Sequence, residues 1–200
     1  LPKEEGIAFA RQSGWANSLR IWGSALELRQ RLIDRLTHLL IEHGYHFKVE
    51  PGYDAVFERN IEDGFQRIAA RIGGEHPAFT CKLDIEQGSK FYTDAMARAG
   101  HVLGNPDGLQ LIINEQLSFF RSLNHPGWRR LPGHVVNLIW TEGWLDWMLD
   151  DLRALVLPVL DEGRTAAGLF RLYTSTTWTN RFPAAIALSG NARVESSLSQ

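Results

Sequence analysis

The sequence predicts an α+β fold, a mostly helical single domain of about five to six helices with a small, largely antiparallel sheet. Apolar residues recur at helical spacing in several long stretches, whereas a few shorter stretches alternate between apolar and polar residues. The chain has 200 residues, of which 44% are hydrophobic, and this is enough for one domain with a substantial core. We therefore expect one globular domain over residues 1–188 and a flexible polar tail over 189–200.

The clearest predicted helix runs from about Ser24 to His43. Ser24 and Glu27 have the spacing of a capping box, and Gly44 follows as a helix stop. One stripe of this helix is apolar and is expected to face the core; it is formed by Leu28, Leu32, Ile33, Leu36, Leu39 and Leu40.

Four further helices are predicted from the same periodicity. The last of them begins near Thr141 as N-cap and stops before Gly163. Its apolar face is expected to comprise Leu145, Met148, Leu149, Leu152, Leu155, Val156 and Val159. The other helices are expected over about 60–72, over about 89–103, and after Asp107 through Leu123.

The strands are predicted from alternation and turn residues. Residues 79–86 alternate without a fault, and residues 46–50 alternate up to the turn residues Pro51 and Gly52, which precede a strand over 53–57. A C-terminal β segment is expected from about Phe170 to Leu188, and its edge could accept an added strand.

Composition excludes some classes of protein. The formal charge is −2 without a block of like charge, which disfavours nucleic-acid binding through a broad basic face. No apolar run reaches the length of a membrane span, and the first residues do not have the pattern of a signal peptide. A single cysteine, Cys81, rules out an internal disulfide, so the expected compartment is the cytoplasm.

Tryptophan clustering gives the main candidate site. Four of the seven tryptophans fall between residues 128 and 147, and tryptophan suits a core seam and a recognition surface about equally. Three lie on one flank of the last long helix, and the other lies in a loop rich in turn residues. The candidate binding residues are Trp140, Trp144, Trp147 and Asp151 on the flank, and Trp128, Arg129, Arg130 and His134 in the loop.

The alternative interpretation is architectural: the tryptophan flank could be a second core seam that a neighbouring helix seals. We expect an intermediate arrangement, a partly sealed seam whose open end binds. Arg29, which lies within the apolar stripe of the first long helix, either reaches solvent or pairs with a buried acid such as Asp151.

A second candidate site depends on strand order. If the strands over 46–50 and 79–86 are neighbours, their polar faces bring together His46, Glu50, Asp84 and Glu86. That set could bind a hard metal ion or perform acid–base chemistry. The alternative is that these residues are the solvated side of amphipathic strands, and we expect that no metal binds.

These observations predict an accessory or adaptor subunit that binds a protein or peptide partner through the tryptophan flank and a β edge and is not catalytic alone. The alternative is an enzyme that acts on a small or planar molecule in a Trp-lined pocket, with or without a metal. In that case Asp151, His125 or His134 would handle protons. The sequence does not identify a cofactor, and neither a membrane nor a nucleic acid is an expected partner.

Overall fold

The computed structural model describes residues 25–75, 78–98, 108–124, 138–139 and 142–174. The elements follow one another along the chain as α2 (Ala25–Ile41), β1 (His46–Lys48), β2 (Ala55–Ile61), β3 (Gly64–Glu75), β4 (Ala78–Ser89), α3 (Lys90–Arg98), β5 (Gln110–Gln116), α4 (Leu117–Asn124), β6 (Leu138–Ile139), α6 (Glu142–Asp151), the π-helix η3 (Leu152–Val156), α7 (Leu157–Glu162) and α8 (Ala166–Thr174).

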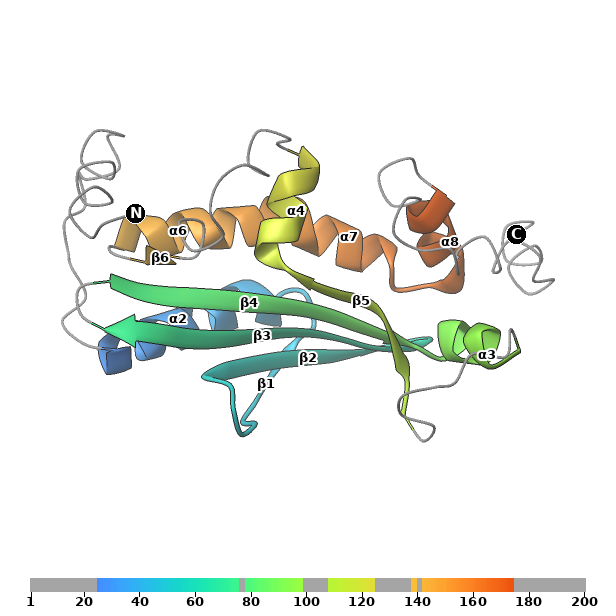
Figure 1. Cartoon of the computed structure of the whole chain (residues 1–200), viewed down its shortest axis with the longest axis horizontal. Helices are drawn as coiled ribbons and strands as arrows, with labels where there is room; N and C mark the ends of the chain where they lie inside the picture. Colours follow the sequence, from blue (N-terminus) through green and yellow to red (C-terminus); the bar gives the residue numbers. More distant parts are fainter. Residues whose placement is uncertain (1–24, 76–77, 99–107, 125–137, 140–141, 175–200) are drawn as a thin grey trace. The chain divides into compact units, whose positions relative to one another are not determined.

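The fold is α+β, but the prediction of a mostly helical chain with a small sheet is wrong. Within the described residues the sheet has six strands, in the order β1-β2-β3-β4-β5, and β6 pairs with β4 off this path (Figure 1). β3 and β4 are twelve residues long each, twice the length of an ordinary strand. The β1–β2 and β4–β6 pairs are antiparallel.

The largest correction concerns residues 60–72, where a helix was predicted. These residues form the end of β2, a tight turn and the first part of β3. The turn requires Gly64, whose φ of 153° is accessible to few other residues and whose α-hydrogen lies against the Gly88 carbonyl. The alternating residues Gln66, Ile68 and Ala70 are buried, as expected of one face of a strand.

Two other segments also differ from the prediction. Instead of one helix from Asp107 to Leu123, the chain forms β5 and then α4. Residues 170–174, predicted as the start of a C-terminal β segment, belong to helix α8, while residues 175–188 lie outside the described part of the chain. The prediction of a C-terminal β edge for partner binding is therefore wrong over residues 170–174 and is not tested over residues 175–188.

Other elements agree with the sequence. The helix predicted over 24–43 is α2, and all but one member of its predicted apolar stripe are buried, Ile33 being half-buried. Its end is a Schellman motif, because the Tyr45 and Gly44 amides donate to the carbonyls of Leu40 and Ile41 and Gly44 has a φ of 81°. The strand predicted over 79–86 lies within β4, whereas β1 covers only the first three residues of the strand predicted over 46–50.

The chain divides into two compact units whose segments interleave in the sequence. Unit 1 comprises Leu1–Glu58, Ile68–Asp84 and Gln116–Val156, and unit 2 comprises Arg59–Arg67, Ile85–Glu115 and Leu157–Gln200. The core of unit 1 includes Leu28, Leu32, Leu36, Phe57, Leu83 and Leu145; that of unit 2 includes Ile85, Phe91, Ile112, Leu157, Leu160 and Leu169. The prediction of one domain over 1–188 stays a prediction, and residues 189–200 lie outside the described residues.

None of the helices in the described part of the chain combines the length and the apolar character needed to cross a membrane.

Candidate functional site

The main predicted site is only partly described. Trp147 and Asp151 lie on α6, are both half-buried, and each takes part in an interaction within the chain. Trp144 also lies in α6, but its side chain is not among those described. The remaining predicted binding residues lie outside the described part of the chain: Trp128, Arg129, Arg130, His134 and Trp140. The same holds for His125.

The apolar face of α6 is sealed as predicted. Leu145, Met148, Leu149 and Leu152 are all at least 95% buried. At 100° per residue, Trp147 and Asp151 lie on another side of the helix, roughly 120° from the centre of this face. The division between a main apolar face and a tryptophan-bearing flank is therefore present in the structure.

Beyond Asp151 the helix changes its register. Residues 152–156 form a π-helical turn, which adds one residue to the helix. The helical pattern predicted that Leu155 and Val159 would be buried, but both are half-buried, and Leu157 and Leu160 are buried instead. The predicted face is thus correct before the π turn and shifted by about one residue after it.

Pro158 explains this turn. Proline has no backbone N–H, so the carbonyl of Ala154 cannot receive the hydrogen bond that an α-helix would place there, and the proline ring crowds the same carbonyl. A π turn just before Pro158 relieves this conflict. Pro158 was thus a signal for this turn in the sequence, but a prediction from the spacing of apolar residues alone does not take it into account.

Two ion pairs in unit 1 show which acidic residues pair with the arginines of α2. Arg35 of α2 donates to the Asp146 carboxylate of α6, so these two helices are neighbours. Arg29 pairs with Asp54, with 3.5 Å between Nε and Oδ1, so the suggested pairing with Asp151 is wrong. Both arginines are close to half exposed, so each pair contributes little to stability.

The predicted metal set does not assemble. β2 and β3 lie between the strands that carry His46 and Asp84, so the assumption that these strands are neighbours is wrong. Asp84 pairs with Arg71, and Glu86 pairs with Arg67 at 3.6 Å. Glu50 lies beyond the end of β1. Within the described residues, no three histidine, cysteine, aspartate or glutamate side chains are placed to hold a metal ion.

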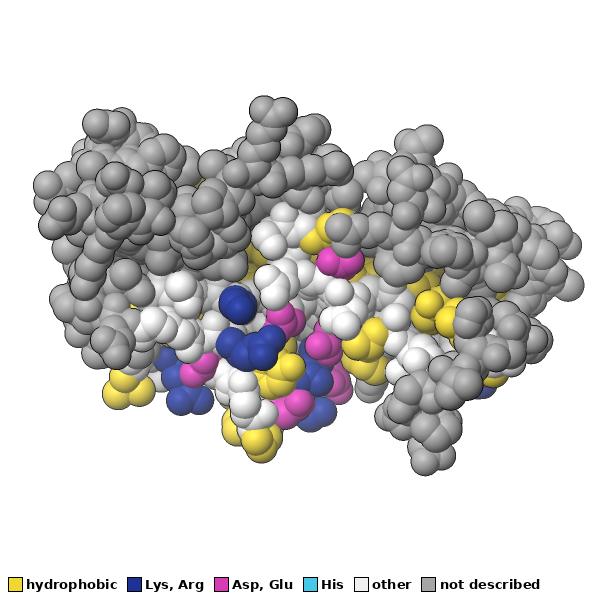
Figure 2. Space-filling model, in the orientation of Figure 1, with side chains coloured by type: hydrophobic (Ala, Val, Ile, Leu, Met, Phe, Trp, Pro, Cys, Tyr) yellow, Lys and Arg dark blue, Asp and Glu magenta, His cyan; other side chains and the backbone are white. Residues whose placement is uncertain are grey.

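The polar side of β4 is also less solvated than predicted. Asp84 is 8% exposed, and the Glu86 side chain is 15% exposed, because arginines of β3 lie over them. The Arg71 guanidinium also lies over the Tyr53 ring, 5.2 Å from its centroid. Figure 2 shows Lys, Arg, Asp and Glu side chains interleaved on the described part of one face, as expected of paired charges.

Sequence reasoning missed a buried polar network in unit 2. Gln66 is fully buried; it accepts a hydrogen bond from Arg59 Nε and donates to Gln87 Oε1 and to the Leu160 carbonyl, at 2.6 to 2.7 Å. Gln87, also fully buried, donates to the Gly163 carbonyl at 2.7 Å. These amides satisfy carbonyls at the C-terminal end of α7, which have no partner inside the helix.

Arg59 completes this network. Its side chain is 4% exposed, and its Nη2 lies 2.8 Å from Asp161 Oδ1, which also pairs with Arg164. A buried guanidinium needs such a partner, since an unpaired buried charge is costly. The network holds the end of α7 against β2, β3 and β4, and its role is structural.

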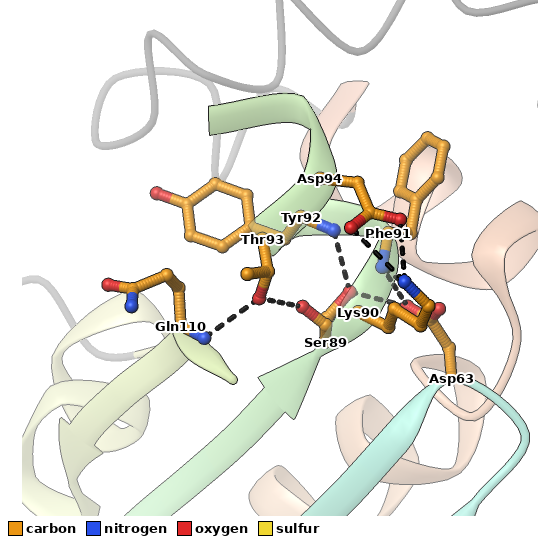
Figure 3. Close-up of polar contacts among 8 residues, drawn as sticks. All are labelled: Asp63, Ser89, Lys90, Phe91, Tyr92, Thr93, Asp94 and Gln110. Atoms are coloured by element: carbon orange, nitrogen blue, oxygen red, sulfur yellow. Dashed lines mark hydrogen bonds and ion pairs between the residues drawn. The ribbon is translucent and has the colours of Figure 1, made fainter. Parts of the chain in front are cut away.

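A second polar cluster surrounds the start of α3 (Figure 3). Ser89 is the N-cap: its Oγ accepts a hydrogen bond from the Tyr92 amide at 3.0 Å and donates to the Asp63 carboxylate. Asp63 also accepts from the Phe91 amide, with its carboxylate near the positive end of the helix dipole. The N-terminus of α3 is thus occupied by the protein's own carboxylate.

We expect Ser89→Ala to lower the free energy of unfolding by about 1–2 kcal/mol, because it removes the cap and one donor to Asp63. Urea denaturation of both proteins measures the change. The adjacent substitution Lys90→Ala is the control, since it breaks only an exposed i,i+4 ion pair and should change stability by less than about 0.5 kcal/mol. Equal effects of the two substitutions would contradict the assigned cap.

Cys81 lies on the apolar side of β4, as predicted, and is 1% exposed. Burial, and then the nearby charges of Asp54 and Asp84, raise the pKa of its thiol far above the usual range. The thiol is therefore protonated at neutral pH and is a poor nucleophile.

We expect Ellman's reagent at pH 8 to react negligibly with the native protein, because the Cys81 pKa is raised and its sulfur is covered. One thiol should react promptly after denaturation in guanidinium, because the chain has a single cysteine. Rapid reaction of the native protein would show that β4 opens at Cys81.

Comparison with family models, curated proteins and solved structures finds no match to this chain.

Proposed function

We propose that this chain is an accessory subunit that binds a protein or peptide partner through the flank of α6 that carries Trp147 and Asp151, here called the α6 flank. The observation that carries the proposal is the contrast between two sides of one helix. The side formed by Leu145, Met148 and Leu149 is sealed in the core, whereas Trp147 on the flank is only half-buried.

The chemistry of the α6 flank supports a protein partner. A tryptophan side chain offers a large rigid surface at a small cost in conformational entropy, and tryptophans are enriched among the residues that dominate binding energy in interfaces. Asp151 lies one helical turn after Trp147, so both residues are on the α6 flank. An aromatic anchor next to a charge favours a partner segment that brings an apolar group and a cation together.

The α6 flank belongs to a helix that its buried side holds in place. Leu145, Leu149 and Leu152 are at least 97% buried, and the exposed ion pair between Arg35 and Asp146 adds only a weak contact with α2. A rigid helix orders few groups when a partner binds, so more of the contact energy is available as affinity.

The test is native mass spectrometry of the tagged full-length chain isolated from its own cells, with the wild type and Trp147→Ala compared. We expect a defined heteromeric complex for the wild type and a weakening of about 30-fold in Kd for the variant, which corresponds to about 2 kcal/mol. Arg153→Ala is the control, because Arg153 is exposed on the same helical run and pairs with Asp150, three residues earlier. We expect the control to change the Kd by less than about twofold.

Circular dichroism and urea denaturation establish that both variants are folded before the comparison is made. Recovery of the chain without a partner would contradict the proposal. Equal weakening by the two substitutions would place the interface elsewhere.

A further inference from the structure

We draw no further inference here: the strongest candidate, the outward-facing apolar row of Leu26, Ile33 and Ile41 along α2, carries none because nothing in the described part of the chain shows what covers it.

Discussion

Substitution of Phe57 by alanine is expected to lower the free energy of unfolding by about 3–5 kcal/mol, the largest single effect that we predict. Phe57 is fully buried in β2 and is among the largest side chains of the core. Its loss removes apolar contacts and leaves a cavity that the paired strands on either side cannot collapse to fill. Urea or guanidinium denaturation followed by circular dichroism measures this change.

Phe47→Ala is the matched control, because the two rings touch but Phe47 is 43% exposed. We expect a loss of about 1 kcal/mol or less for this control, since half of its surface is already in contact with water. A loss for Phe47→Ala as large as that for Phe57→Ala would mean that the β1 edge is covered in solution.

Gln66→Met is expected to lower the free energy of unfolding by about 2–4 kcal/mol, although methionine has a similar shape. The substitution removes three hydrogen bonds and leaves Arg59 Nε, Gln87 Oε1 and the Leu160 carbonyl without this partner in a buried place. Unsatisfied buried polar groups cost about 1–3 kcal/mol each, with partial relief from relaxation. Chemical denaturation measures the loss, and amide exchange near Leu160 should accelerate.

Gln30→Met provides the control for the same chemical change. Gln30 is exposed on α2 and donates one hydrogen bond to Asp34, four residues later. We expect this control to change stability by less than about 0.5 kcal/mol. Similar losses for the two glutamine substitutions would show that the buried network does not hold α7 to the sheet.

The elements that were predicted well share one property: their polar and apolar residues lie on separate faces, at the spacing of a helix or a strand. The stripe of α2, the face of α6 and the alternation of residues 79–86 follow the helical and strand periods directly. In each case the apolar residues face the core and the flanking turn residues have their ordinary roles.

The hairpin at residues 55–75 was not predictable in this way, because its strands bury polar residues. Arg59 and Gln66 face inward, and this conceals the alternation of β2 and β3. The apolar residues that remain, such as Ile61, Phe65 and Ile68, happen to be spaced as in a helix. The dipeptide Asp63-Gly64 was the available signal, since Asp-Gly commonly marks a turn.

The candidate site was predictable only at the level of single helices. The flank of α6 follows from helical geometry, but strand order does not follow from sequence alternation, and the predicted metal set depended on that order. Helix α8 was missed because residues 170–178 alternate. The signal for it was Thr165, whose hydroxyl caps the helix by accepting from the Gly168 amide.

The π turn before Pro158 has a consequence for evolutionary comparison. Such a turn holds one residue more than an α-helix that joins the same two buried faces, so it is equivalent to a single-residue insertion. A relative that lacks the proline could keep both faces with an uninterrupted helix that is one residue shorter. If such a relative is aligned with this chain and has a one-residue gap between residues 152 and 156, the gap would therefore mean that the buried faces before and after it are packed in the same way.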